Sequence, residues 1–341
     1  MHSVTLENAV GQVLGHDITE VNGKKNYKGV AFKRGHIIRD EDLEHLRSLG
    51  KNHIYIWEGS ETEIHEDAAA RLLAPQIAGA HIRYDEQPHE GKVGFYAEAK
   101  GIFKVDRRRL ELINSLAIPS LPTIHNNFPV EQGKQVAAFR IIPLTCSSEL
   151  LEQIEFLLHD PLLSVLPYRV RTASILVTGS EVYSGRITDG FTPLLTGKLK
   201  QHGVEVVYST ILPDSKEDIS AAVEQAAAKS ELVLVTGGTS VDPDDVTVRA
   251  MKEAGVRFSD QGNPIQPGNN LTIGRIGSVP VCAVPGAALF FKRTALDIFL
   301  PRLLAGDEIS KGEIISSGHG GLCHFCPECH YPVCPFGWGS L

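Results

Sequence analysis

From residue 173 to about residue 304, short apolar runs alternate with helical patterns, and this alternation constrains the fold more than any other feature. The apolar runs lack a polar residue at every second position, so we expect each to be a strand buried on both faces. The runs are 174–177, 204–208, 232–235 and 279–284, and the helical patterns are 191–202, 215–229, 247–254 and 287–304. Strands of this kind alternating with helices predict an α/β domain, a three-layer doubly wound parallel sheet covered on both faces.

The remaining sequence divides into three further parts. Residues 1–59 carry one helical pattern that ends at Gly50 and leads into the β-branched and aromatic run 54–57, which predicts a small α/β element. Residues 60–168 show one helix pattern and several short strand-like runs, which predict a mixed α+β region. We therefore place the main domain at residues 169–307 and a cysteine-rich tail at 308–341.

Composition narrows the class of protein. A chain of 341 residues that is 42% hydrophobic can bury a sizeable core. The formal net charge of −8 opposes non-specific binding to nucleic acid or anionic lipid. No stretch approaches the ~20 apolar residues that span a bilayer, and the first residues show no signal-peptide pattern. We expect a cytoplasmic protein with neither nucleic-acid nor membrane partners.

Three predicted strands end in glycine turns, and two of these turns also carry hydroxyl side chains. Ligands bind at the carboxyl ends of strands in open parallel sheets. Glycine lets the backbone approach a ligand closely, and hydroxyl groups donate hydrogen bonds to phosphate oxygens. Each turn alone is equally typical of an ordinary strand-to-helix connection, but three together favour a phosphate site. The turn residues are Thr178, Gly179, Ser180 and Glu181; Thr236, Gly237, Gly238, Thr239 and Ser240; and Pro285 and Gly286.

Acidic residues follow two of these turns. Glu181 and Asp189 come after the first turn, and Asp242, Asp244 and Asp245 come after the second. Carboxylates beside a phosphate repel it unless a hard cation lies between them, so the pattern predicts Mg²⁺ bridging an aspartate to the ligand. Asp244 is equally typical of a helix N-cap.

In order and spacing, these motifs resemble the molybdenum cofactor biosynthesis domain family, whose members bind molybdopterin or adenylylated molybdopterin. The resemblance covers about residues 172–306 and includes Gly185, Asp214 and Thr247. Residues 6–57 resemble more weakly the N-terminal region of the molybdenum insertases called MoeA. One departure from MoeA is the segment 266–270, which has no lysine where those proteins usually carry one.

The resemblance implies an enzyme, a molybdopterin molybdenumtransferase that binds the pterin nucleotide and molybdate and uses Mg²⁺ held by Asp189 and Asp245, its candidate catalytic residues. It also implies a homodimer, with a molybdoenzyme or another cofactor-biosynthesis protein as a further partner. Two alternatives stay open. One is a non-catalytic molybdopterin carrier or sensor, and the other is a nucleotide pyrophosphatase of the competence-damage protein type, which segment 243–247 resembles.

Four of the six cysteines crowd into the tail with the spacing C-x2-C-x2-C-x4-C. In a reducing compartment such a group more often shares a metal than forms disulfides. Zinc accepts four cysteines with loose spacing, and His319, His324 and His330 offer substitutes. The spacing also lies one residue from the bacterial [4Fe–4S] pattern C-x2-C-x2-C-x3-C-P. Zinc is therefore expected, with a [4Fe–4S] cluster as the alternative; the four ligands would be Cys323, Cys326, Cys329 and Cys334.

Overall fold

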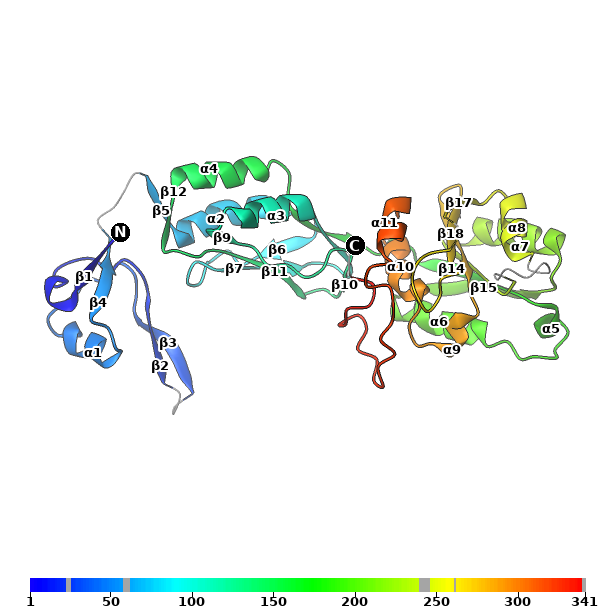
Figure 1. The fold of residues 1–341 in the computed structure, drawn as a ribbon, viewed down its shortest axis with the longest axis horizontal. Coiled ribbons are helices and arrows are strands. Elements are labelled where there is room, and N and C mark those ends of the chain that lie inside the picture. The colour runs from blue at the N-terminus through cyan, green and yellow to red at the C-terminus, as the bar shows by residue number, and fades with distance from the viewer. Residues whose placement is uncertain (23–25, 58–61, 239–245, 261, 339–341) are drawn as a thin grey trace. The chain divides into compact units, whose positions relative to one another are not determined.

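The computed structural model forms two compact units, which are described separately (Figure 1). The described residues are 1–22, 26–57, 62–238, 246–260 and 262–338. Unit 1 comprises residues 1–96, 105–123 and 135–163, and unit 2 comprises residues 97–104, 124–134 and 164–341.

The N-terminal part of unit 1 is the small α/β element that the sequence predicts. Its helix α1 (Asp42–Ser48) is followed by β4 (His53–Ile56), which pairs antiparallel with β1 (His2–Thr5). The core contains Leu46 and Ile56, which are almost completely buried. A second antiparallel pair is formed by β2 (Ile18–Asn22) and β3 (Tyr27–Phe32).

The middle part of unit 1 is mixed α+β, as expected. Helix α2 (Glu66–Ile77) buries Ala69, Leu73 and Ile77 at helical spacing. A four-stranded sheet, counted among the described residues, has the order β6-β7-β11-β9. The further elements of this part are β5 (Glu63–His65), β6 (Ile82–Tyr84), β7 (Val93–Ala97), α3 (Arg107–Ser115), β9 (Pro119–Ser120), β11 (Gln135–Ile141), β12 (Thr145–Ser147) and α4 (Ser148–Leu157).

The free energy of unfolding of unit 1 should depend on pH through Glu66, the first residue of α2. Burial raises the pKa of its carboxyl from 4.5 to about 7, although the Arg140 guanidinium 3.4 Å away opposes the shift. Between these two values the folded chain holds a proton that the unfolded chain has released. The free energy of unfolding of unit 1 should therefore fall by about 3 kcal/mol as the pH rises from 4.5 to 7, and change little above that.

Glu66→Gln should remove most of this pH dependence, because glutamine does not ionise. Urea unfolding at pH 5 and pH 8 would measure it, followed by the fluorescence of Trp57 in a Trp338→Phe background. Trp57 lies edge-on to His65, next to Glu66, with ring centroids 6.3 Å apart. Equal pH dependence in the wild type and the glutamine variant would contradict the assignment.

Unit 2 is built on a six-stranded sheet, counted among the described residues, with the order β15-β14-β16-β19-β18-β17. Strands β14, β15, β16 and β19 are parallel to one another. The strands are β14 (Thr172–Thr178), β15 (Glu205–Leu212), β16 (Val233–Thr236), β17 (Arg257–Asp260), β18 (Thr272–Ile276) and β19 (Val279–Val284). A separate small sheet of unit 2 contains β8 (Gly101–Val105), β10 (Pro129–Val130) and β13 (Leu163–Pro167).

Helices cover both faces of the large sheet and give the three layers that the sequence predicts. Ile175 and Val177 of β14 pack on one face with α6 and α10, while Leu176 between them packs on the other face with α7 and α8. None of the helices in the described part of the chain is long and apolar enough to span a membrane. The helices of unit 2 are α5 (Ser180–Tyr183), α6 (Phe191–Gln201), α7 (Lys216–Lys229), α8 (Thr247–Glu253), α9 (Ala287–Phe290), α10 (Ala295–Leu304) and α11 (Lys311–Ser316).

Three details differ from the sequence prediction. The run 204–208 is not buried on both faces, because β15 lies at one end of the strand order and its residues are exposed or half-buried in alternation. The sheet is not wholly parallel, because β18 pairs antiparallel with β19 and β17 pairs antiparallel with β18. The expected single helix over 287–304 is interrupted between α9 and α10. The reason is Asp297, whose carboxylate accepts a hydrogen bond from the Thr294 backbone N–H at 2.9 Å and caps α10. The same carboxylate pairs with buried Lys198 at 2.6 Å and with Arg293 at 2.9 Å.

Candidate functional site

The four parallel strands of unit 2 end at one edge of the sheet. Thr178 at the end of β14 lies opposite Leu212 at the end of β15. Thr236 at the end of β16 lies opposite Val284 at the end of β19. The turns that the sequence singled out therefore leave the sheet side by side, as expected for a ligand site in an α/β domain.

The turn after β14 is tied to the turn after β15 by a reciprocal pair of hydrogen bonds. The Ser180 backbone N–H donates to Asp214 Oδ2 at 2.8 Å, and the Asp214 backbone N–H donates to Ser180 Oγ at 3.3 Å. Gly179 makes the turn at a φ of 143°, a conformation that favours glycine. Asp214 was part of the family resemblance but had no predicted role, and its signal in the sequence was its place directly after a strand. The neighbouring Glu181 is exposed.

The two threonines at the strand ends face the interior. Thr178 Oγ1 donates to the Thr236 carbonyl oxygen at 2.9 Å and forms a hydrogen bond with Thr247 Oγ1 at 3.0 Å. Thr236 is fully buried, and its hydroxyl oxygen has no hydrogen-bond partner among the described residues. The Thr178 hydroxyl thus holds adjoining strand ends together, and the Thr236 hydroxyl is buried, so contacts from this part of the edge to a ligand would come from the backbone.

Asp189 lies at the start of α6 and caps that helix. Its Oδ1 accepts hydrogen bonds from the backbone N–H groups of Phe191 at 2.7 Å and Thr192 at 3.1 Å. No hydrogen bond to its other oxygen, Oδ2, is seen in the part of the chain that the structure describes. Asp189 therefore has one oxygen engaged in the fold and one available to a cation.

The other two predicted turns are described in part. Gly237 and Gly238 both have positive φ, 84° and 51°. Pro285 is buried and Gly286 is exposed just before α9. The remaining predicted site residues Thr239, Ser240 and Asp245, and the neighbouring Asp242 and Asp244, lie outside the described residues.

Gly237→Ala should destabilise unit 2 strongly, because a Cβ there would collide with the Thr178 carbonyl oxygen. That oxygen belongs to the end of β14 and has little room to move. We expect a loss of at least ~3 kcal/mol, the sum of the left-handed backbone strain and the collision. The matched control is Gly277→Ala, where φ is 56° and nothing lies within 4 Å of the added atom, so only ~1 kcal/mol is expected. Urea unfolding measures both, and equal losses would show that the close approach is unimportant.

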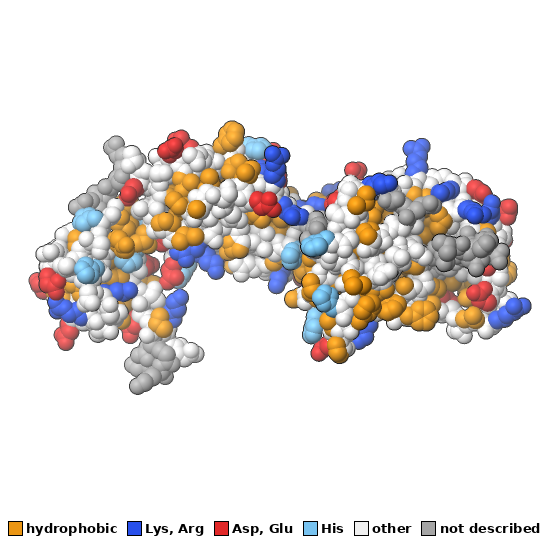
Figure 2. All heavy atoms as spheres, viewed as in Figure 1, with side chains coloured by type: hydrophobic (Ala, Val, Ile, Leu, Met, Phe, Trp, Pro, Cys, Tyr) orange, Lys and Arg blue, Asp and Glu red, His pale blue; other side chains and the backbone are white. Residues whose placement is uncertain are grey.

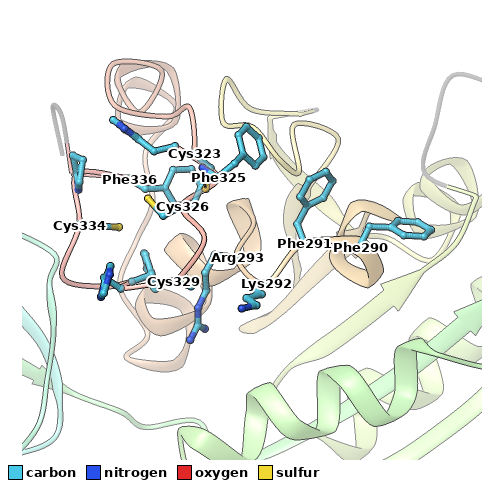
Figure 3. A pocket seen from close by; sticks show the side chains of 14 residues that line it. Phe290, Phe291, Lys292, Arg293, Cys323, Phe325, Cys326, Cys329, Cys334 and Phe336 are labelled. Carbon is cyan, nitrogen blue, oxygen red and sulfur yellow. Dashed lines mark hydrogen bonds between the residues drawn. The ribbon is translucent and has the colours of Figure 1, made fainter.

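A second candidate site is a cavity of about 310 Å³ beside the cysteine-rich tail (Figure 3). All four tail cysteines line it, with Phe291, Lys292 and Arg293 from the segment between α9 and α10. The sequence predicted that these cysteines share one site, but it did not predict the basic and aromatic residues around them. Among the described residues, no three His, Cys, Asp or Glu side chains converge closely enough to hold a single metal ion.

The surroundings of this cavity shift the pKa values of two of its side chains, Cys334 and Arg293. Burial raises the pKa of the Cys334 thiol, and negative charge on the other three tail cysteines would raise it further. Burial lowers the pKa of Arg293, but the hydrogen bond to the Asp297 carboxylate, 2.9 Å away, and the charge of that carboxylate outweigh the effect and raise the pKa overall.

Comparison with known proteins supports the resemblance seen in the sequence for the main α/β domain. Residues 174–305 match a family described as "Probable molybdopterin binding domain", and residues 3–58 match a domain of unknown function. Residues 174–305 are thus similar to a probable molybdopterin binding domain, while the finer resemblance to MoeA stays a prediction.

Relatives share only parts of the chain. A putative competence-damage inducible protein of Levilactobacillus brevis is 29% identical over 133 residues, which cover 34% of this chain and 32% of that protein. A putative molybdopterin biosynthesis protein of Methanocaldococcus jannaschii is 32% identical over 102 residues, covering 30% of this chain and 25% of that protein. This chain therefore spans about a third or less of the length of these curated relatives.

The solved structure of a tungsten cofactor synthesizing protein MoaB from Pyrococcus furiosus is also similar. Its TM-score is 0.30 at 20% identity, and the match covers 40% of this chain and 96% of that one.

Proposed function

We propose that unit 2 binds molybdopterin or adenylylated molybdopterin at the edge where β14, β15, β16 and β19 end, and that the chain acts in molybdenum cofactor biosynthesis. The observation that carries the proposal is the alignment of these four strand ends, three of which are followed by glycine turns. The match of residues 174–305 to a probable molybdopterin binding domain supports the class of ligand.

The residues at this edge suit an anionic ligand bound with a divalent cation. Glycine turns let backbone N–H groups approach phosphate oxygens closely. The free Oδ2 of Asp189 is the kind of hard oxygen that Mg²⁺ prefers, and Asp245 would be the second ligand from the adjoining turn. When bound, Mg²⁺ would neutralise charge that develops on a phosphoanhydride. Asp214 and Ser180 hold the turn that positions the ligand.

For the reaction, we propose a molybdopterin molybdenumtransferase. Water attacks the phosphoanhydride of the pterin nucleotide and AMP leaves, and the two dithiolene sulfurs bind molybdenum in place of a molybdate oxygen, which leaves as water with the two thiol protons. Positioning and charge neutralisation are the main requirements of such a step. The test incubates the purified chain with adenylylated molybdopterin, Mg²⁺ and molybdate. Release of AMP together with molybdenum bound to the pterin supports the transferase. Tight binding without AMP release would instead support a carrier or sensor.

The second candidate reaction is hydrolysis of a nucleotide pyrophosphate. The similarity to a competence-damage inducible protein favours it. Its test is the same assay with a nucleotide pyrophosphate that lacks a pterin. Turnover of that compound, with none of the pterin nucleotide, would replace the transferase proposal.

For partners, we propose a homodimer that passes the cofactor to a molybdoenzyme or to another cofactor-biosynthesis protein. Analytical ultracentrifugation would test the dimer, and a monomer at micromolar concentration would contradict it.

A further inference from the structure

The cysteine-rich tail is held against unit 2 at several points. Next to the first cysteine, the Cys323 backbone N–H donates to the Gln266 carbonyl oxygen at 2.8 Å, and the Gln266 N–H donates to the Gly321 carbonyl oxygen at 2.8 Å. Beyond the third cysteine, the Tyr331 hydroxyl donates to the Asp297 carbonyl oxygen at 2.9 Å. Phe336, after the fourth, is almost completely buried in the core of unit 2. The segment between these anchors therefore has a defined path.

This path places the four cysteines around one cavity rather than along an open strand (Figure 3). Cys323 and Cys334 are half-buried, and Cys326 and Cys329 are exposed. The site therefore combines two inner thiols with two that incoming metal can reach.

The cavity that the four cysteines line is large enough for a cluster of several metal ions. Four thiolates on a single zinc, with Zn–S distances near ~2.3 Å and tetrahedral angles, have their sulfurs only about 3.8 Å apart. In a [4Fe–4S] cluster each thiolate binds a different iron, so the cysteines stand apart around the cluster. The cavity of about 310 Å³ between them has room for such a body.

The surroundings suit a negatively charged cluster. Arg293 and Lys292 line the same cavity as the four cysteines. Phe291 and Phe325 contact each other with ring centroids 5.8 Å apart. Figure 2 shows hydrophobic side chains along the lower edge of unit 2. Phe290 and Phe325, which line the cavity, are 81% and 57% exposed. Basic neighbours and an apolar shell are the features by which a protein tunes an iron–sulfur cluster.

We propose that Cys323, Cys326, Cys329 and Cys334 bind a [4Fe–4S] cluster in this cavity. Two ferric ions, two ferrous ions and four sulfide ions come from outside the chain, so the [4Fe–4S]²⁺ cluster forms with no net transfer of electrons. Four S–H bonds are replaced by four Fe–S bonds, and four protons are released. Pro335 directly follows the fourth cysteine, as in the bacterial cluster pattern, and the last gap is longer by one residue. This assignment replaces the zinc that the spacing alone favoured, and it is independent of the pterin site.

The test uses the full chain, purified without oxygen and then supplied with equal amounts of ferric and ferrous iron and with sulfide, with a parallel sample supplied with zinc. Iron, acid-labile sulfide and zinc are measured per chain, and electron paramagnetic resonance is recorded after reduction with dithionite. We expect roughly four irons and four sulfides per chain, with a signal from the reduced cluster.

Cys326→Ala and Cys329→Ala should each lower the bound iron at least threefold and abolish the signal. Both residues are exposed, so the fold should survive, and circular dichroism checks it. The matched control is Cys146→Ala, because Cys146 is buried in unit 1 and should leave the iron content unchanged. In the sample supplied with iron and sulfide, one zinc per chain in place of iron, or neither metal, would overturn the proposal. Full iron content in both tail variants would overturn it too.

Discussion

Asp189→Asn should lower the turnover of the pterin nucleotide by about 100- to 1000-fold while leaving α6 folded. Asparagine retains a side-chain oxygen that accepts the hydrogen bonds from Phe191 and Thr192, and it caps helices as well as aspartate does. It loses the negative charge that the proposed Mg²⁺ site needs. Asp245→Asn should have a similar effect if both carboxylates hold the same cation.

Asp189→Ala separates the two roles of this residue. Alanine removes the cap as well as the charge, so it should cost about 1 kcal/mol of stability beyond the loss of activity. Turnover, Mg²⁺ dependence and thermal midpoint would be measured on both variants. Wild-type turnover in the asparagine variant, with a lower thermal midpoint in the alanine variant, would show that Asp189 only caps α6.

Gly238→Val should abolish binding of molybdopterin to unit 2. Gly238 lies directly after the glycine that packs against Thr178, with a φ of 51°, at the edge where the strands end. A branched side chain there would occupy space that the ligand's phosphate needs, and it would also strain the backbone. Isothermal titration calorimetry with molybdopterin and a thermal midpoint on the same sample would measure both effects.

Gly203→Val is the control variant that measures the effect of backbone strain alone. Gly203 has a φ of 76°, nothing lies within 4 Å of an added Cβ, and it follows α6, just before β15 begins. The two valine variants should lose similar stability, but only Gly238→Val should lose binding. Normal binding by a folded Gly238→Val chain would remove this turn from the proposed site.

The layered architecture could be predicted because β14, β16 and β19 are apolar at consecutive positions, which only burial on both faces explains. The antiparallel pairing of β17 and β18 at one side of the sheet could not be predicted, because periodicity does not show strand direction. The helix break could not be predicted either. It depends on Asp297, which pairs with Lys198 from a helix far away in the sequence.

At the site, the glycine turns could be predicted from residue type and position. The inward direction of the Thr178 and Thr236 hydroxyls could not, because it depends on neighbouring strands and on Thr247. The spacing of the tail cysteines predicted that they share a site. The cavity around them could not be predicted, because it depends on the backbone hydrogen bonds at Gln266 and on Arg293.

The most direct test of the central claim is the pterin content of the protein itself. The full chain would be expressed in cells that make molybdopterin and purified, then treated with acid and iodine so that any bound pterin becomes a fluorescent oxidised product. We predict nearly one pterin per wild-type chain and almost none in Gly238→Val, with Gly203→Val equal to the wild type. A wild-type chain that carries no pterin and gains none when incubated with molybdopterin would contradict the account.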